Sequence, residues 1–412
     1  FLAKLCRFNP VRFMNWQLTN GSTLVNWSDR PKPNDRSQTM RNGVSYEYII
    51  LLANTLNKDI WINVPHQASD EYILQMARLF RYGLKPNIKV YLEYSNEVWN
   101  WMFSQADWVV NHGNKNISYP RNYAERALNA FRIWHQEWAG QTNRVKRVLA
   151  TQTGYPFISE EMLAQAKGEF DVFSPTFYFG YGGTCLDNLR TLGAAATPTD
   201  VINCTRTSMR AFFPNIHQTY RLAQLYGKPI AHYEGGQHMT SNPTIEPFQT
   251  ALYQTQIDPQ IKTLYQEMID SLRRYGGTTH AVAYELTGPR ESRYGSWGHI
   301  EDIFQDTSIT PAPKYQVLKD NFGYNQGNCN VDLTARIVAL PPDCASAVQI
   351  KSTKLGTSQQ IYSSDWIKAN TATTIDAIQH INYTAEQYIL LEPNVEVKQG
   401  GFFEVKIGGG CP

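Results

Sequence analysis

Two glutamates stand where strand-like runs of the sequence pass into loops. Glu97 follows the run 89–95, and Glu234 follows the run 229–233. Two carboxyl groups on one rim, meaning the edge of a sheet or barrel at which its strands end, can divide acid–base chemistry between them. One, with a raised pKa, protonates a leaving oxygen, while the other stays ionised and attacks carbon or stabilises positive charge. A single glutamate at a strand end is more often a solvated loop residue, so it is the pair, with its surroundings, that indicates chemistry.

A parallel α/β fold is expected to position this pair. Runs rich in Val, Ile, Tyr and Phe alternate with helical patterns up to about residue 322. These runs cover residues 11–16, 59–64, 89–95, 148–153, 172–179, 229–233 and 280–286. No glycine-rich phosphate loop follows the first run, which favours a (β/α)8 TIM-type barrel over a doubly wound sheet. Active sites of such barrels lie at the carboxyl ends of the strands, where both glutamates stand.

The expected barrel is short by one strand. The sequence shows seven strand-like runs, whereas this type of barrel has eight. The missing strand is either unrecognised or upstream of residue 1. Residue 1 reads as the middle of an element, and neither an initiating Met nor a signal-peptide core is present, so we expect a fragment or a processed chain.

Two of the intervening helices are well marked. Residues 70–82 carry an apolar face, with acidic residues in the first turn and Gly83 after the last. Residues 259–275 carry a longer apolar stripe, with Asp258 as the expected N-cap and Gly276 as the stop.

The composition narrows the class of protein. Of the 412 residues, 42% are hydrophobic, 18% charged and 13% aromatic, which excludes a disordered or fibrous chain. No apolar run approaches the ~18 residues of a membrane helix, so we expect no membrane span. The net charge of +2 does not indicate a phosphate-tracking surface, so we expect no nucleic-acid partner. The aromatic excess fits either core packing or a sugar-stacking cleft.

The character of the sequence changes after about residue 323. Helical periodicity fades, and short strand-like runs bounded by turns follow, including 381–385, 388–392 and 402–407. We therefore expect two domains: a barrel over residues 1–325 and a small all-β module over residues 326–412.

The strand-end motifs resemble those of the glycoside hydrolase clan A superfamily. Its barrels carry an Asn-Glu acid/base at the end of strand 4 and a nucleophilic Glu at the end of strand 7. Residues 91–97, Tyr-Leu-Glu-Tyr-Ser-Asn-Glu, look like the first motif, and residues 230–235, Ile-Ala-His-Tyr-Glu-Gly, look like the second. Residues 12–16, Arg-Phe-Met-Asn-Trp, are similar to the strand 2 motif. The resemblance covers residues 1 to about 322 and fits if strand 1 lies upstream.

The resemblance implies a role for each matching residue. Glu97 would be the acid/base and Glu234 the nucleophile, with Asn96 bound to the sugar 2-hydroxyl. Arg12 would orient Glu234 and keep it ionised, because a nearby cation lowers the pKa of a carboxyl group. Tyr178, at the end of the sixth strand, would donate to Glu234. Strict alternation along a strand would put Asn96 and Glu97 on opposite faces, so the strand must end or bulge there.

Further candidates rest on position alone. His66 follows the run 59–64 at the same rim and either binds a substrate hydroxyl or is structural. Trp16, Tyr284 and Trp297 lie at or after strand ends and fit sugar stacking or core packing equally. The clan has a Trp at the end of strand 8, where this chain has Tyr284.

The other acidic residues and histidines are weaker candidates for the functional site. Glu93 is expected to be buried inside the barrel, and Glu285 and Glu301 are weaker rivals near the last strand. The histidines that flank Glu234 match no metal motif. We therefore expect no metal and no cofactor.

The cysteines are relevant to whether the protein is exported from the cell. None of the six lies in a CxxC pair. Cys185 with Cys204, and Cys329 with Cys344, bracket loop-like stretches and are either disulfides of an exported protein or separate buried thiols. Cys6 is expected to be an ordinary core thiol.

The C-terminal pattern resembles the three-coathanger stack module of Bacteroidetes, which is appended to secreted proteins. That resemblance implies an extracellular or cell-surface protein. The scattered aromatics of residues 326–412 do not favour a carbohydrate-binding module.

The sequence as a whole predicts a monomeric retaining glycoside hydrolase that acts on β-linked polysaccharides or oligosaccharides. The alternative is a non-catalytic glycan- or cellulose-binding surface protein on the same barrel.

Overall fold

The structure is a computed structural model of the chain. It describes residues 1–39, 42–241, 243–323 and 331–337, and beyond these the strands given below. The chain divides into two units, Phe1–Arg336 and Ile337–Pro412. The division thus falls at 336/337 rather than at the expected 325/326. One reason is that Asp332 belongs to the first unit, where it bonds Lys85 and the backbone of Thr55.

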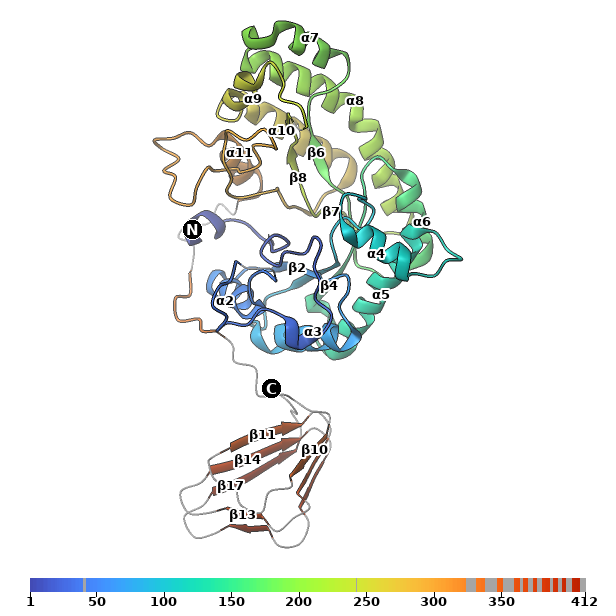
Figure 1. Cartoon of the computed structure of the whole chain (residues 1–412), viewed down its shortest axis with the longest axis vertical. Coiled ribbons are helices and arrows are strands. Elements are labelled where there is room, and N and C mark those ends of the chain that lie inside the picture. Colours follow the sequence, from blue (N-terminus) through green and yellow to red (C-terminus); the bar gives the residue numbers. More distant parts are fainter. Residues whose placement is uncertain are drawn as a thin grey trace. The chain divides into compact units, whose positions relative to one another are not determined.

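The first unit is built on a curled sheet of parallel strands (Figure 1). Its strands are β1 (Val11–Arg12), β2 (Ile60–Val64), β3 (Val90–Tyr94), β4 (Val145–Ala150), β5 (Val172–Ser174), β6 (Phe177–Phe179), β7 (Ala231–His232), β8 (Gly235–Gln237) and β9 (His280–Ala281). β1 to β5 pair in chain order. A bridge between Phe173 and Ile230 continues the sheet to β7, which pairs with β9, while β6 pairs with β8.

Helices separate the strands in sequence. They are α1 (Leu2–Leu5), α2 (Tyr46–Leu56), α3 (Asp70–Gly83), α4 (Ser104–His112), α5 (Tyr119–Glu137), α6 (Pro156–Ala166), α7 (Thr184–Leu192), α8 (Pro198–Leu225), α9 (Gln249–Thr255), α10 (Ile261–Gly276) and α11 (Pro313–Phe322). Figure 1 shows α3 and α5 side by side on the outer face of the sheet. Strand–helix alternation with parallel pairing is the α/β arrangement that the sequence predicts.

The two marked helices are confirmed, with small shifts at their ends. α3 begins after Ser69, whose side chain accepts a hydrogen bond from the Tyr72 backbone N–H. α10 begins at Ile261 rather than 259, because Asp258 caps the preceding turn by accepting from the Gln260 N–H. Both helices bury the apolar stripe that the spacing indicated.

Two of the expected strands are interrupted. The run 172–179 divides into β5 and β6 at Pro175, which has no N–H to offer a ladder. The run 229–233 gives β7, and after Tyr233 and Glu234 the chain resumes as β8. The interruptions matter because they lie where the candidate site residues stand.

The sheet is open between β1 and β9. Within the described residues no ladder joins these two strands, and their residues are half-buried, whereas β2 and β3 are buried along their full length. A cavity of about 280 Å³ lies at this opening. Its lining comes from α1, β1, residues 281–287 and α11. A complete eight-stranded barrel stays a prediction.

The second unit holds β10 (Ala347–Ile350), β11 (Gln359–Ser363), β12 (Trp366–Ala369), β13 (Thr373–Ile375), β14 (His380–Ala385), β15 (Tyr388–Leu391), β16 (Val395–Val397) and β17 (Phe402–Ile407). The pairs formed by these strands are all parallel. Gln359 pairs with Ile381, Thr373 with Val395 and His380 with Phe402, each 22 residues further along. The offset of 22 residues recurs in four of the five strand pairs, while β10 pairs with β12 at an offset of 19. The recurrence indicates a repeated coil, a period that the sequence analysis did not recognise. The coathanger-stack resemblance stays a prediction.

The cysteines differ from expectation at one position. Cys185 and Cys204 form a disulfide between α7 and α8. Cys6 is disulfide-bonded, so its interpretation as an ordinary core thiol was wrong. Cys329 and Cys344 lie outside the described residues. None of the helices in the described part of the chain is both long and apolar enough to span a membrane.

Candidate active site

Glu97 follows β3 on a backbone that leaves the extended conformation. β3 ends at Tyr94, and both Ser95 (φ 56°) and Glu97 (φ 42°) lie in the left-handed region. A residue other than glycine pays about 1–3 kcal/mol in such a conformation, so the surrounding contacts must impose it. Asn63 on β2 does so in part, because its Nδ2 donates to the Ser95 carbonyl at 2.6 Å. The turn ends strict alternation, as the presence of Asn96 and Glu97 at one rim requires.

Each oxygen of Glu97 accepts a hydrogen bond. The Tyr233 hydroxyl donates to Oε1 at 2.8 Å, and Asn100 Nδ2 donates to Oε2 at 2.8 Å. Tyr233 is fully buried, and it immediately precedes Glu234. The acid/base candidate is therefore held by the residue that adjoins the nucleophile candidate.

Glu234 is buried and is held by two other groups. Arg12 Nη1 donates to its Oε2 at 2.9 Å, and the Tyr178 hydroxyl donates to its Oε1. Arg12 comes from the end of β1 and Tyr178 from β6. Three residues that the sequence placed together from separate strand ends thus meet at one carboxyl group.

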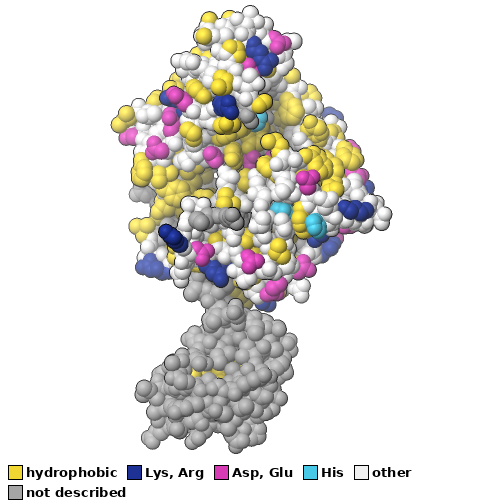
Figure 2. Space-filling view, in the orientation of Figure 1, with side chains coloured by type: hydrophobic (Ala, Val, Ile, Leu, Met, Phe, Trp, Pro, Cys, Tyr) yellow, Lys and Arg dark blue, Asp and Glu magenta, His cyan; other side chains and the backbone are white. Residues whose placement is uncertain are grey.

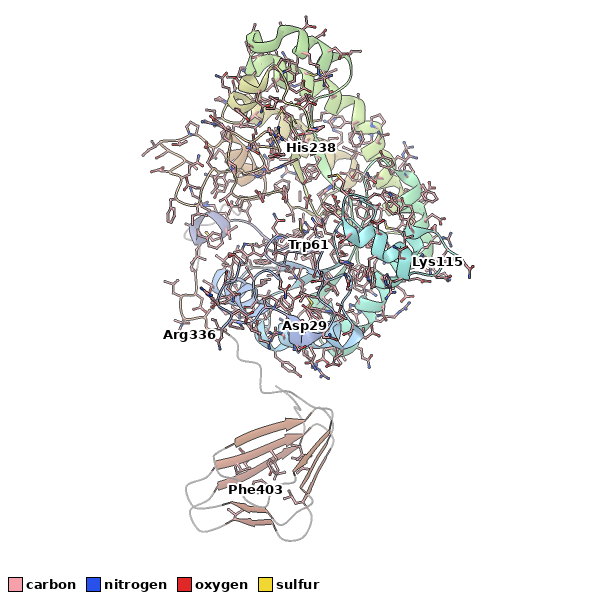
Figure 3. The ribbon with its side chains drawn as sticks, in the orientation of Figure 1. Asp29, Trp61, Lys115, His238, Arg336 and Phe403 are labelled. Carbon is pink, nitrogen blue, oxygen red and sulfur yellow. A yellow bond between two sulfur atoms is a disulfide. The ribbon has the colours of Figure 1, made fainter. Side chains whose placement is uncertain are left out.

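Arg12 links the rest of the rim to Glu234. Its Nη2 donates to Glu93 Oε2 at 2.9 Å and to Asn96 Oδ1 at 2.8 Å. Glu93 is fully buried, as expected, and also accepts from Trp61 Nε1 at 2.7 Å. Figure 3 labels Trp61, which lies on β2 in the middle of the first unit. The guanidinium thus fixes both Asn96 and Glu234.

Burial decides the protonation of Glu234. Desolvation raises the pKa of Glu234 to about 7, although Arg12 acts to lower it and Glu97 raises it further. Burial also raises the pKa of Glu93, again against Arg12. Arg12 thus acts on Glu234 in the expected direction, by favouring its ionised form, but one cation shared by two buried carboxyl groups does not offset their desolvation.

Asn96 is anchored on the side away from Arg12. Its Nδ2 donates to Asn20 Oδ1 at 3.1 Å, and Gln105 Nε2 donates to the same oxygen at 2.7 Å and to the Asn96 carbonyl at 2.8 Å. The amide group is therefore oriented before any ligand binds, and its second N–H is the donor that a substrate hydroxyl could accept.

Aromatic rings gather beside Glu234. Trp297 lies edge-on to Tyr178 at 6.0 Å between ring centroids and to Tyr284 at 5.7 Å, and its ring lies 5.1 Å from that of His238. Figure 3 labels His238, just after β8. The rings of Tyr284 and Trp297 are thus brought together with that of Tyr178, while their role in sugar stacking stays a prediction.

Trp16 and Glu285 line the cavity that also reaches Glu234. Asn15 Nδ2 donates to Glu285 Oε2 at 3.0 Å and to the Tyr284 hydroxyl at 3.3 Å. Burial raises the pKa of Glu285, while the Asn15 hydrogen bond opposes it. Glu285 therefore belongs to the wall of the site. Glu301 lies near Arg290, and its backbone N–H donates to Gln305; these contacts do not reach the rim.

His66 is not joined to the glutamates. It is buried, packs edge-on against Trp108 at 5.6 Å and lies near Gln67. Burial lowers the pKa of His66 to about 4. Its buried Nδ1 has no hydrogen-bond partner within the described residues, so a hydroxyl-binding role stays a prediction.

Four supporting residues were missed by the sequence analysis: Tyr233, Asn100, Asn15 and Asn20. Tyr233 and Asn100 lie next to or three residues after a candidate glutamate, and that proximity was the available signal. Asn20 and Asn15 carry no such signal, since only the folded chain brings them to Asn96 and Glu285. No group of three or more His, Cys, Asp or Glu side chains able to hold a metal occurs in the part of the chain that the structure describes.

Comparisons with known proteins found structures but no sequence relatives. No family model matches the chain, and no curated protein matches it. The structures include a family 51 arabinofuranosidase from Xanthomonas axonopodis pv. citri, with 14% identity, a TM-score of 0.43 and coverage of 70% of this chain and 60% of that one.

Two further structures are also glycoside hydrolases. One is a modular endo-β-1,4-mannanase from Cellulomonas fimi, with 12% identity, a TM-score of 0.40 and coverage of 74% and 65%. The other is a 4-O-α-L-rhamnosyl-β-D-glucuronidase from Fusarium oxysporum, with 10% identity, a TM-score of 0.47 and coverage of 77% and 62%. This chain thus spans 60 to 65% of the length of these three proteins.

Proposed function

We propose that the protein is a retaining glycoside hydrolase of β-linked polysaccharides or oligosaccharides, with Glu234 as nucleophile and Glu97 as acid/base. One observation carries the proposal: two glutamates from separate strand ends are each held by their own pair of donors. Arg12 and Tyr178 hold Glu234, while Tyr233 and Asn100 hold Glu97. This division supports two different roles for two carboxyl groups.

In the first step, Glu234 attacks the anomeric carbon of the substrate in its ionised form, which Arg12 favours and which, at a pKa of about 7, is populated from neutral pH upward. Glu97 gives its proton to the leaving glycosidic oxygen, so the glycosidic bond breaks as the bond to Glu234 forms. Water then attacks the anomeric carbon of the glycosyl ester, Glu97 takes the proton of that water, and Glu234 leaves as the carboxylate. Two inversions give net retention.

The surrounding residues fit the needs of this reaction. Asn96 is already oriented by Arg12 and Asn20 and can donate to a sugar hydroxyl. The rings of Tyr284 and Trp297 can contact the apolar face of a sugar. For double displacement, we expect the carboxyl groups of Glu97 and Glu234 to lie about 5–5.5 Å apart.

The proposal extends to the compartment. The disulfide between Cys185 and Cys204 supports an extracellular or cell-surface location, because such bonds persist in oxidising environments.

The test is hydrolysis of a panel of β-glucans, mannan and xylan by the protein and by Glu234→Ala. We expect sugar release by the unmodified protein and none by the variant. NMR of the first product formed should show the anomer of the substrate, and an inverted anomer would contradict double displacement. Binding without release on every substrate would instead favour the non-catalytic glycan-binding alternative.

A further inference from the structure

The rim is rich in carboxyl groups and poor in cations. Glu93 and Glu97 both act electrostatically on Glu234, and Glu285 lines the cavity that also reaches Glu234. Among the side chains lining that cavity, Arg12 is the one Lys or Arg. Even with one carboxyl group protonated, these five groups carry a net negative charge.

Most N–H groups of Arg12 are already bonded within the protein and are not available to a ligand. Its side chain is only 4% exposed. Its Nε lies 3.3 Å from Glu93 Oε2, and Nη1 and Nη2 bond Glu234, Glu93 and Asn96. The Tyr233 ring covers the guanidinium at 5.1 Å. Bidentate capture of a substrate carboxylate needs two free N–H groups on one edge, and Arg12 does not present them.

The neighbouring basic residues do not replace it. Burial lowers the pKa of His66 to about 4 and of His299 to about 3, and it lowers the pKa of His238, so these rings are neutral near pH 7. Lys314 is buried behind the site, where its Nζ donates to Gln256 and to the Ser296 carbonyl. Arg293 contacts Tyr294.

The rest of the cavity is predominantly apolar. Its lining includes Leu5, Phe8, Val282, Leu286 and Leu318. Figure 2 shows hydrophobic side chains gathered between scattered charges on the visible face of the first unit. An anionic group entering here would lose hydration beside Glu234 and Glu285, and among the described residues that line this cavity it would find no Lys or Arg besides Arg12. In Figure 3, Lys115 lies at the edge of this unit, away from Trp61 and His238.

We propose that the site accepts neutral glycans and rejects glycans made of uronic acids. The inference rests on the proposed function and adds the class of substrate. Like charges placed together at a desolvated site cost several kcal/mol, which corresponds to at least about 100-fold in kcat/KM.

The experiment uses pairs of aryl β-glycosides that differ only at C6, namely glucoside with glucuronide and galactoside with galacturonide, together with xyloside. We expect the neutral member of any hydrolysed pair to exceed the uronide at least about 100-fold in kcat/KM. Glu285→Gln keeps the shape of the side chain and removes one charge, so the ratio of uronide to neutral activity should rise several-fold. Raising the salt concentration should move that ratio the same way.

The outcomes separate the inference from the proposed function. A uronide hydrolysed as well as its neutral partner would overturn the inference and leave the glycosidase intact. If no glycoside is hydrolysed, the proposed function fails, and calorimetric binding of neutral glucan or mannan oligosaccharides against oligogalacturonate decides the charge preference. Preferential binding of the neutral oligosaccharides supports the inference, whereas binding of oligogalacturonate, or of none of them, overturns it.

Discussion

The hydroxyl of Tyr233 donates to Glu97 Oε1 at 2.8 Å, so the residue that precedes one glutamate of the site holds the other. Tyr233 lies between β7 and β8, where the ladder is interrupted and two consecutive side chains reach the same rim. The interruption thus couples the position of Glu97 to that of Glu234. Burial raises the pKa of Tyr233 well above its ordinary value, and Glu97 raises it further, so the phenol stays protonated as a donor.

Tyr233→Phe should therefore lower kcat/KM. A hydrogen bond to a charged group contributes about 1.5–3 kcal/mol, which corresponds to a loss of about 10- to 100-fold. The matched control is Tyr72→Phe, which removes a buried tyrosine hydroxyl, bonded to Tyr46 at 2.7 Å between α2 and α3, away from the glutamates. Both variants should lose some stability, measured by thermal unfolding. Equal kcat/KM in the two variants would show that the Tyr233 hydrogen bond does not serve the reaction.

The two glutamates should differ in their dependence on the leaving group. Glu97→Gln removes the proton donor, so hydrolysis of an aryl glycoside with a poor leaving group should fall about 100-fold or more, and that of a dinitrophenyl glycoside much less in the first step. Glu234→Gln removes the nucleophile and should abolish turnover of both substrates. Steady-state and burst kinetics on the two substrates provide the measurement. The reverse pattern would exchange the assigned roles.

The sequence predicted the rim more fully than it predicted the contacts. Periodicity placed Glu97 and Glu234 at strand ends, which parallel strands bring to one edge, whereas Arg12, Asn96 and Tyr178 were implied by the resemblance to the clan A motifs. The sequence predicted that the strand ends or bulges at Asn96 and Glu97, but not how, because nothing in Ser-Asn-Glu requires left-handed residues. Only the contacts of the folded chain, such as the bond from Asn63, impose that conformation.

Hydrogen bonds between residues far apart in the sequence could not be predicted for a related reason. Asn15 donates to Glu285, which lies 270 positions away in the sequence, and neither residue's type indicates that the other is its partner. The raised pKa of Glu234 could not be predicted either, since it depends on how far the effect of burial exceeds that of Arg12. The 22-residue register of the second unit was present in the sequence, but its short strands differ in composition from one turn to the next.

Glu234 should make the folded protein less stable at alkaline pH. Its pKa is raised to about 7 in the folded state, whereas an unfolded glutamate has a pKa of about 4.3. The folded state therefore binds the proton more tightly, and its stability falls as the pH rises between these values. At pH 8, burying the ionised group costs about 3.6 kcal/mol, since one pKa unit corresponds to about 1.4 kcal/mol.

Glu234→Gln does not titrate. Its amide oxygen can still accept from Arg12, whereas its amide nitrogen can only donate to the Tyr178 hydroxyl oxygen, so that hydrogen bond reverses direction. The free energy of unfolding of this variant, relative to the unmodified protein, should therefore be higher at pH 8 by about 3 kcal/mol than at pH 4. Urea unfolding at both pH values measures the difference, and the other titrating groups cancel in it. A difference independent of pH would show that Glu234 has an ordinary pKa in the folded protein.

The Cys185–Cys204 disulfide should hold α7 in place without affecting the reaction. Leu189 is the one buried residue of α7, so apolar packing contributes little to its attachment, and the ion pair of Arg190 with Glu246 at 2.7 Å is partly exposed. Closing a loop of 19 residues stabilises the folded form by about 3 kcal/mol.

The double variant Cys185→Ala, Cys204→Ala should therefore expose α7 to trypsin at Arg190. We expect cleavage there at least about tenfold faster than in the unmodified protein, because local opening is no longer opposed by the loop. Arg210 is the matched control: it is exposed on α8, paired with Glu267, and should resist cleavage in both proteins. Cleavage at both arginines would mean that the disulfide stabilises the unit globally. Loss of kcat/KM without cleavage would instead place the disulfide among the groups that position Tyr178.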